Sequence, residues 1–199
     1  MKIDPSRLRR RILTVQIAGW PRVIPLRHRA TPASAGLGSS RFSDPDRTFR
    51  VLYAGENFAT AFAEGVVRDR LAGKSRRFLY RPYIEQLALT EIASSRPLVL
   101  LDLTGEAAYE LGVDTDVRGS RAHTAGQMFS RAVHAQMPDV DGLLFPSRLT
   151  DKRCIAAYDR AFDDLSGTPP IGLIQADQLA AELERLDITL RRRRGLAPS

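Results

Sequence analysis

Hydrophobic positions along the chain follow two patterns, one typical of strands and one typical of helices. Short apolar or alternating runs predict strands at residues 22–26, 51–54, 87–92, 98–103, 142–145 and 188–190. Helical spacing predicts helices at residues 58–71, 124–136 and 177–186, and residues 155–162 fit either type. Short strands interspersed with helices, and no long linker between them, predict an α+β fold in a single domain.

The helix predicted over residues 58–71 has signals at both ends. Asn57 is a preferred N-cap residue, and Gly73 would stop the helix. Three large apolar residues recur at the spacing of a buried helical stripe, namely Phe58, Phe62 and Val66. Glu64 lies on a different face, four residues before Arg68. On residue types alone, this spacing predicts a surface ion pair worth about 0.3–0.5 kcal/mol.

Length and composition describe an ordinary soluble protein. The chain has 199 residues, of which 43% are hydrophobic, enough for a sizeable core. No apolar run approaches the ~18 residues that span a bilayer, and no secretory signal is visible. Cys154 is the only cysteine, which excludes an intrachain disulfide. We therefore expect a cytoplasmic protein without membrane contact.

The formal net charge of +7 is concentrated at the two ends of the chain. Residues 1–11 and the arginines at 191–194 hold most of the excess, so the body of the chain is close to neutral. We expect solvated, poorly ordered ends. The alternative is a non-enzymatic module that binds nucleic acid through these basic tails.

Common catalytic motifs are missing from the sequence. The three histidines and Cys154 lack metal-ligand spacing, and no Gly-x-Ser-x-Gly elbow occurs. The Pro-, Ala-, Gly- and Ser-rich stretch 31–46, which we expect to be the least ordered internal segment, contains neither a dinucleotide motif nor a P-loop. Metal-dependent and nucleophilic mechanisms are therefore disfavoured.

A set of short segments, in one order, carries a family resemblance. They are Trp20-Pro21-Arg22-Val23, Ser40-Arg41-Phe42, Leu52-Tyr53-Ala54, Thr60-Ala61-Phe62-Ala63-Glu64, Leu100-Leu101-Asp102-Leu103, His123-Thr124-Ala125-Gly126-Gln127 and Gly142-Leu143-Leu144-Phe145-Pro146-Ser147. Their order and spacing resemble the RES domain family, the toxin half of RES–Xre toxin–antitoxin pairs. The resemblance runs from about residue 20 to residue 162.

This resemblance implies a fold similar to that of ADP-ribosyltransferase toxins, with short mixed and antiparallel strands. It implies a basic segment at 1–15, a RES domain at 16–190 and a basic tail at 191–199. The implied activity is cleavage of NAD⁺ at the nicotinamide–ribose bond, by hydrolysis or phosphorolysis, which depletes cellular NAD⁺. The implied alternative is transfer of ADP-ribose to a protein. NAD⁺ is then a substrate and no cofactor or metal is required.

The implied protein partner is an Xre-type antitoxin that neutralises the toxin and forms a higher-order complex with it. Nucleic acid would be contacted only indirectly, through the antitoxin.

The catalytic residues implied by the resemblance are Glu64, Arg22 and Ser147. Nicotinamide leaves as a neutral molecule, so one carboxylate that stabilises an oxocarbenium-like state is sufficient, and Glu64 suits that role. Arg22 could fork onto the pyrophosphate, although Arg27 or Arg29 could be the family arginine instead. Ser147 could hydrogen-bond the substrate or orient Glu64.

The implied substrate-binding residues are Tyr53, Arg41 and Thr124. Tyr53 could stack on the nicotinamide ring, and Arg41 could assist at the pyrophosphate. Thr124 would lie at a helix start, where backbone N–H groups can face an anion. Each also has a purely structural interpretation: a half-buried strand aromatic for Tyr53, loop ordering for Arg41 and a helix cap for Thr124. Ser147 could likewise be only a turn residue.

Overall fold

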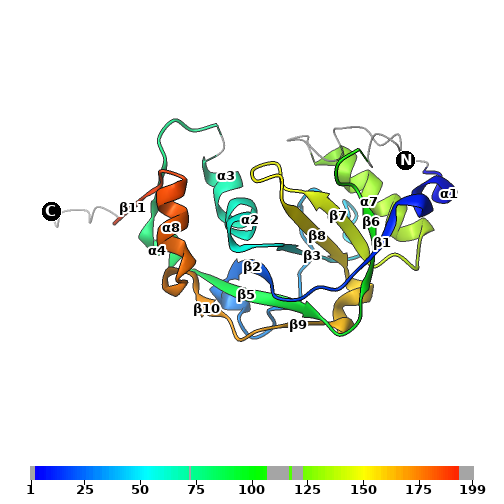
Figure 1. Ribbon diagram of the computed structural model, residues 1–199, viewed down its shortest axis with the longest axis horizontal. Helices are drawn as coiled ribbons and strands as arrows, with labels where there is room; N and C mark the ends of the chain where they lie inside the picture. The colour runs from blue at the N-terminus through cyan, green and yellow to red at the C-terminus, as the bar shows by residue number, and fades with distance from the viewer. Residues whose placement is uncertain (1–2, 72, 107–116, 118–122, 193–199) are drawn as a thin grey trace.

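The computed structural model describes residues 3–71, 73–106, 117 and 123–192. Its largest sheet has five strands in the order β1-β6-β7-β8-β3 (Figure 1). These are β1 (Ile12–Val15), β6 (Leu98–Asp102), β7 (Gly142–Pro146), β8 (Arg153–Tyr158) and β3 (Val51–Gly55). β6 and β7 are parallel, and the other neighbours are antiparallel.

Two smaller sheets complete the strand arrangement. In the second sheet, β5 pairs with three antiparallel neighbours. Its members are β2 (Trp20–Pro25), β5 (Leu87–Ser94), β9 (Leu165–Gly167) and β10 (Ile171–Gly172). The third sheet is the parallel pair β4 (Phe78–Tyr80) and β11 (Thr189–Arg191).

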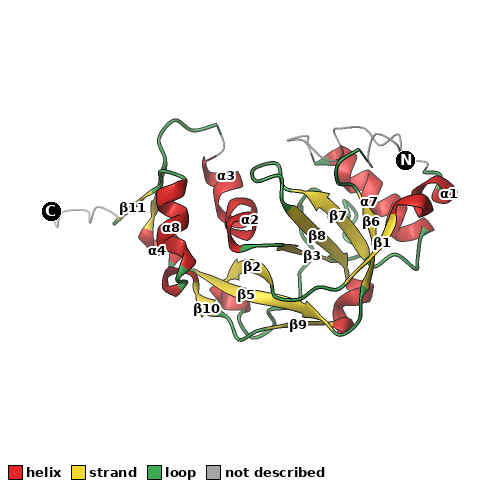
Figure 2. Ribbon diagram, in the orientation of Figure 1, coloured by secondary structure: helices red, strands yellow, loops and turns green. Residues whose placement is uncertain are grey.

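Helices flank the sheets at both ends of the molecule (Figure 2). The α-helices are α1 (Pro5–Leu8), α2 (Phe58–Phe62), α3 (Arg68–Leu71), α4 (Arg81–Ile84), α7 (Thr124–Gln136) and α8 (Gln178–Arg185). A π-helical turn, Ala63–Val67, joins α2 to α3. Short 3₁₀ turns occupy Arg9–Arg11, Leu26–His28, Asp159–Asp164 and Leu173–Gln175. None of the helices in the described part of the chain has the length and apolar character that a membrane crossing requires.

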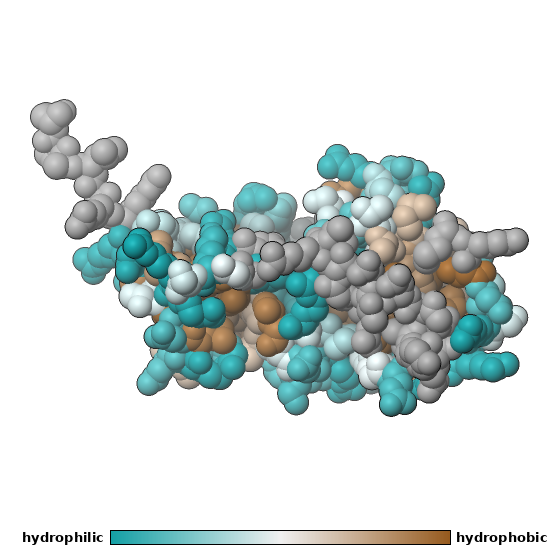
Figure 3. Space-filling view, turned by 90° about the horizontal axis from the view of Figure 1, so that it is seen from above, coloured by the Kyte–Doolittle hydropathy of each residue, from teal (hydrophilic) through white to brown (hydrophobic). Residues whose placement is uncertain are grey.

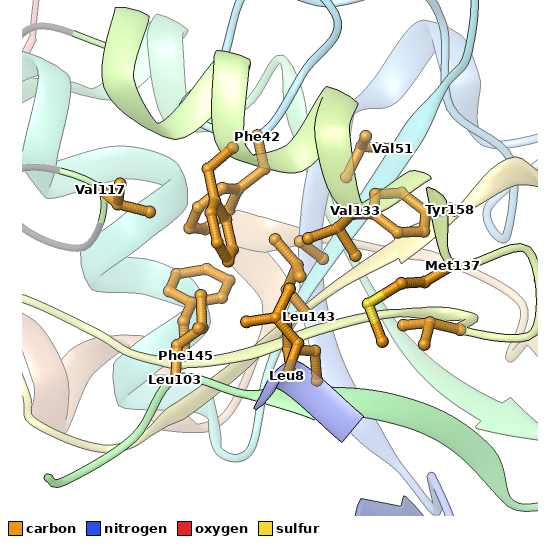
Figure 4. Packing of buried hydrophobic residues seen from close by; sticks show 14 of the residues in the cluster. Leu8, Phe42, Val51, Leu103, Val117, Val133, Met137, Leu143, Phe145 and Tyr158 are labelled. Carbon is orange, nitrogen blue, oxygen red and sulfur yellow. The ribbon is translucent and has the colours of Figure 1, made fainter. Parts of the chain in front are cut away.

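Strand alternation gives the large sheet two buried faces. On β3, Val51 and Tyr53 join the cluster beneath α7, whereas Leu52 and Ala54 join the cluster that faces the second sheet. Figure 4 shows the first cluster, in which side chains from α1, α7, β3, β6, β7 and β8 pack together. A third cluster lies between α2, α3, α8 and β5, and it contains the predicted stripe Phe58, Phe62 and Val66. The predicted α+β single-domain fold is confirmed.

The structure corrects the expectation of a poorly ordered N-terminus. Residues 5–8 form α1, whose Leu8 is buried, and β1 pairs with β6 along the edge of the large sheet. Arg9 is bound by both carboxylate oxygens of Asp139, at 2.6 and 2.9 Å. Burial of Leu8 and the pairing of β1 with β6 therefore order this segment despite its high positive charge. At the other end, residues 193–199 lie outside the described residues.

The structure also corrects the expectation for residues 31–46. This segment has no strand, but its residues 41–44 are buried: Phe42 is fully inaccessible, and Arg41 is 4% exposed. The ring of Phe42 packs edge-on against Phe145 at 4.9 Å. A single aromatic anchor thus fixes a stretch whose composition suggests a loose loop. The ambiguous residues 155–162 divide between the end of β8 and the following 3₁₀ turn.

Candidate active site

The turn from β3 into α2 positions the candidate site. Asn57 caps α2, because its side-chain oxygen accepts the backbone N–H of Thr60 at 2.9 Å. A Cβ on Gly55 would lie 2.8 Å from the backbone nitrogen of Ala61, so only glycine lets the helix start this close to the strand end. The helix therefore projects directly from the edge of the large sheet.

Glu64 lies in the π-helical turn that follows α2. Such single wide turns are rare and are often found at functional sites. The next residue, Gly65, packs against β2: a Cβ there would be 3.2 Å from the Cβ of Val23. The turn thus brings Glu64 between the second sheet and the large sheet.

Both oxygens of Glu64 are held by side chains. The Ser147 hydroxyl, which follows β7 and is 1% exposed, donates to Oε1 at 2.7 Å. Nη1 of Arg68 donates to Oε2 at 2.8 Å. The predicted i,i+4 ion pair exists, but it is not a surface pair, since only 15% of the Glu64 side chain is accessible. Two charge-assisted hydrogen bonds fix the orientation of the carboxylate.

Glu64 faces a cavity of about 230 Å³ between the two larger sheets. Residues from β2, β3, β7, β8, α2, the π-helical turn and α3 line it, including Arg22, Tyr53, Arg68, Phe145 and Cys154. Of the predicted site residues, the structure brings Glu64, Arg22 and Tyr53 to this cavity, with Ser147 bonded to Glu64 from beside it.

Arg22 lines the cavity from β2, and one of its guanidinium nitrogens lacks a hydrogen-bond partner among the described residues. Its Nη1 is buried and has no hydrogen-bond partner among the described residues. Burial lowers the pKa of Arg22 to about 10, so the guanidinium is still cationic at neutral pH. A buried, unpaired guanidinium nitrogen is costly, and its position favours an anionic ligand at this wall. Arg27 and Arg29 are exposed and line a different surface hollow.

Tyr53 lines the cavity from β3 with its hydroxyl already engaged. The backbone N–H of Phe42 donates to this oxygen at 2.9 Å. Burial raises the pKa of Tyr53 to about 12, so the phenol stays neutral at physiological pH. The ring lies edge-on to Phe145 at 6.3 Å. Tyr53 therefore supplies an aromatic wall and also anchors the loop that contains Phe42.

Arg41 precedes Phe42 in this loop and is not among the residues that line the cavity. Burial lowers the pKa of Arg41, and the nearby negative charge of Glu64 partly opposes that effect. A Cβ on Gly126 of α7 would be 2.6 Å from Cγ of Arg41, so this glycine makes room for the arginine. Gln127 donates to the carbonyls of Ser39 and Ser40 at 3.3 and 3.2 Å. The segment around residue 126 thus secures the loop at the cavity.

Thr124 does not reach the cavity. It is the first residue of α7, as predicted, but it is exposed and is absent from the lining. Residues 123–127 nevertheless contribute to the site, because His123 and Gln127 bind the loop carbonyls.

Two lining residues with ionisable side chains, Arg68 and Cys154, are not among the predicted site residues. The sequence predicts Arg68 only as an ion-pair partner of Glu64. The same i,i+4 spacing is also the signal that places Arg68 beside Glu64 at the cavity. Cys154 has no local sequence signal, and it reaches the cavity because β8 pairs with both β3 and β7. Burial raises the pKa of the Cys154 thiol, which therefore stays protonated. Among the described residues, no group of three or more His, Cys, Asp or Glu side chains is arranged to hold a metal ion.

The chain is similar to known proteins in both sequence and fold. Residues 11–181 match the family model of the RES domain. "Probable toxin y4kH" of Sinorhizobium fredii is 26% identical over 101 residues, which are 50% of this chain and 80% of that protein. The crystal structure of the M. tuberculosis MbcT–MbcA toxin–antitoxin complex contains a chain with a TM-score of 0.64 and 17% identity, covering 83% of this chain and 89% of that chain. The two proteins share a fold. Because the family model matches most of this chain, the chain belongs to the RES domain family.

Proposed function

We propose that this protein is the toxin of a toxin–antitoxin pair and that it cleaves NAD⁺ between nicotinamide and ribose. The observation that carries this proposal is the pairing, in one cavity, of a fixed carboxylate at Glu64 with the buried, unpaired Nη1 of Arg22. A dinucleotide presents a glycosidic carbon that gains positive charge and a pyrophosphate that carries negative charge. The two side chains match these two groups.

The bond that breaks joins C1′ of the ribose to the ring nitrogen of nicotinamide. Both electrons go to the nitrogen, so nicotinamide departs as a neutral molecule and C1′ becomes cationic. The Glu64 carboxylate stabilises this cation, since Ser147 and Arg68 already hold its orientation. Each carboxylate oxygen has a further lone pair, which leaves room for a ribose hydroxyl. An acceptor oxygen then bonds to C1′ and loses its proton to solvent.

The size of the cavity fits one end of the dinucleotide. Its volume of about 230 Å³ is below the roughly 300–1,000 Å³ of sites that enclose whole drug-sized ligands. We therefore assign it to the nicotinamide riboside half, with the aromatic wall of Tyr53 and Phe145 against the nicotinamide ring. The pyrophosphate would lie at Arg22, and the adenosine half outside the cavity.

The experiment that tests this proposal is product analysis with purified, antitoxin-free protein and NAD⁺. We expect one nicotinamide released per NAD⁺ consumed. Free ADP-ribose would identify water as the acceptor, a phosphorylated ADP-ribose would identify inorganic phosphate, and label retained on a protein band would identify a protein. NAD⁺ that stays intact through prolonged incubation with folded protein would refute the proposal.

We propose a neutralising antitoxin of the Xre type as the partner. The similar fold of the toxin in the MbcT–MbcA complex supports a protein partner, and the family resemblance supports its type. Co-expression of such an antitoxin should restore growth and stop NAD⁺ loss together. Restored growth with continuing NAD⁺ loss would contradict this assignment.

A further inference from the structure

A second hollow lies beside α3 and shares no lining residue with the catalytic cavity. It has a volume of about 720 Å³ and lies between the end of α3, residues 73–76 and β4. Figure 1 shows these elements at the end of the molecule that also holds α8. From above, the same half displays hydrophobic side chains among hydrophilic ones (Figure 3). We call this hollow the β4 groove.

The described residues that line the β4 groove include cations and no acid. Arg70, Lys74 and Arg76 line it, and no Asp or Glu is among the lining residues whose side chains the structure describes. Lys74 and Arg76 are exposed, so their ammonium and guanidinium groups are accessible to a ligand. This charge favours an anionic occupant.

Among the strands that the structure describes, β4 pairs only with β11, which leaves its other edge open toward the groove. Phe78, Leu79 and Tyr80 all line the groove, although consecutive strand residues point to opposite faces, so the groove follows the edge of the strand. β11 occupies the other edge, where the Arg77 carbonyl accepts the N–H of Thr189 at 3.1 Å. Because backbone groups alternate along a strand, the N–H groups of Phe78 and Tyr80 point toward the open edge. An open edge is a template for another strand.

The aromatic rings of the groove are poorly placed for nucleic acid. Single-stranded nucleic acid binds by stacking bases on free ring faces. The guanidinium of Arg70 lies 3.6 Å from the ring centre of Tyr83, and that of Arg191 lies 4.4 Å from the ring centre of Phe78. Phe78 and Tyr80 meet edge-on at 5.4 Å. Arginines therefore cover one face of two of the three rings in the lining, and an extended peptide fits the groove better than a run of stacked bases.

We propose that the β4 groove docks an extended acidic segment of a partner protein. The segment pairs as a strand with the open edge at Phe78 and Tyr80. Its carboxylates lie against Lys74 and Arg76, and its alternate side chains cover the exposed ring of Tyr80, which is 47% accessible. This surface shares no lining residue with the catalytic cavity.

The test uses a fluorescent eight-residue peptide of alternating Glu and Val, titrated by anisotropy to millimolar concentration. We expect saturable binding that weakens with salt and protection of the Phe78 and Tyr80 amides from hydrogen exchange. The double variant Lys74→Glu/Arg76→Glu should weaken binding about tenfold or more, because two favourable contacts become repulsive. N-methylation of the peptide on alternate residues, which blocks strand pairing on one edge, should weaken it to a similar extent.

The control for charge is Arg27→Glu/Arg29→Glu, which makes the same change in net charge at exposed positions away from the groove. It should alter binding less than about threefold, since only long-range screening remains. Equal loss in both double variants, unchanged binding of the N-methylated peptide, or absence of peptide binding would overturn the proposal. Tighter binding of a twelve-residue oligo-dT at the same salt would also overturn it, in favour of nucleic acid.

Discussion

Replacing Ser147 by alanine removes one hydrogen bond whose contribution can be worked out from the structure. The hydroxyl donates to Oε1 of Glu64 at 2.7 Å and is almost completely buried. Hydrogen bonds to charged groups contribute about 1.5–3 kcal/mol. At about 1.36 kcal/mol per tenfold in rate, full loss of the Glu64 orientation lowers kcat/KM by about 10- to 150-fold. Because Ser147 is outside the cavity lining, kcat should fall more than KM changes.

The assay is nicotinamide release at varied NAD⁺ concentration, with thermal unfolding measured on the same samples. The matched control is Thr60→Val. Thr60 is an equally buried hydroxyl at this site, but it contacts Thr150 at 3.0 Å and not Glu64. Thr60→Val should lose stability of about 1 kcal/mol with little change in kcat. Ser147→Thr, which keeps a hydroxyl, should recover part of the lost rate.

Ser147 also accepts the backbone N–H of Leu149 at 3.2 Å, so its replacement has a structural cost as well. A purely structural role would lower the unfolding temperature and leave kcat within about twofold of wild type after correction for the folded fraction. That outcome would refute the positioning role of Ser147.

Other substitutions test the remaining parts of the site and fold. Arg22→Met should lower kcat/KM by about tenfold or more yet raise stability by about 1–3 kcal/mol, because a buried unpaired group is removed; a variant that is less stable and fully active would contradict this. Cys154 should resist a disulfide reagent at pH 8 until the protein unfolds, because burial raises the pKa of its thiol; fast labelling of native protein would be inconsistent with that environment. The pKa of Asp141 lies below its ordinary value. Burial alone would raise this pKa, but the hydrogen bonds from Arg96 and the Val99 N–H lower it by more. Asp141→Asn should therefore cost about 2–3 kcal/mol at pH 6, a difference that shrinks as the pH falls below about 4, as followed by chemical denaturation; a difference independent of pH would exclude the ionic contribution.

The helical segment that contains Glu64 shows which features a local sequence pattern can predict. The cap at Asn57 and the apolar stripe predicted both its start and its buried face. The π-helical turn at Ala63–Val67 carries no comparable signal, because it depends on how Gly65 packs against β2. Periodicity therefore predicted the helix, and tertiary packing decided where Glu64 points.

The N-terminal segment shows why its charge gave a wrong prediction of a poorly ordered end. Its arginines suggested a solvated tail, but Leu8 is buried and β1 hydrogen-bonds to β6. The pairing partner lies more than eighty residues away, so no local pattern could predict it. Likewise, Phe42 anchors its loop because Phe145 of β7 packs against its ring and the Tyr53 hydroxyl of β3 accepts its backbone N–H.

The candidate site depended on the family resemblance more than on local chemistry. Residue types alone favoured a surface ion pair between Glu64 and Arg68, and the pair is present but enclosed. The contact between Ser147 and Glu64 spans 83 residues of sequence, and the resemblance, not the hydrophobic pattern, suggested it. The catalytic roles of these residues remain predictions.

The most direct test compares Glu64→Gln with Glu85→Gln in the release of nicotinamide from NAD⁺. Each glutamate forms an i,i+4 ion pair with an arginine at 2.8 Å, but the pair of Glu85 with Arg81 is exposed, and neither residue lines the cavity. We expect Glu64→Gln to lower the rate by about 10²–10³-fold and Glu85→Gln to leave it unchanged, since only Glu64 can stabilise the ribosyl cation. Equal rates in the two folded variants would contradict the central role of Glu64.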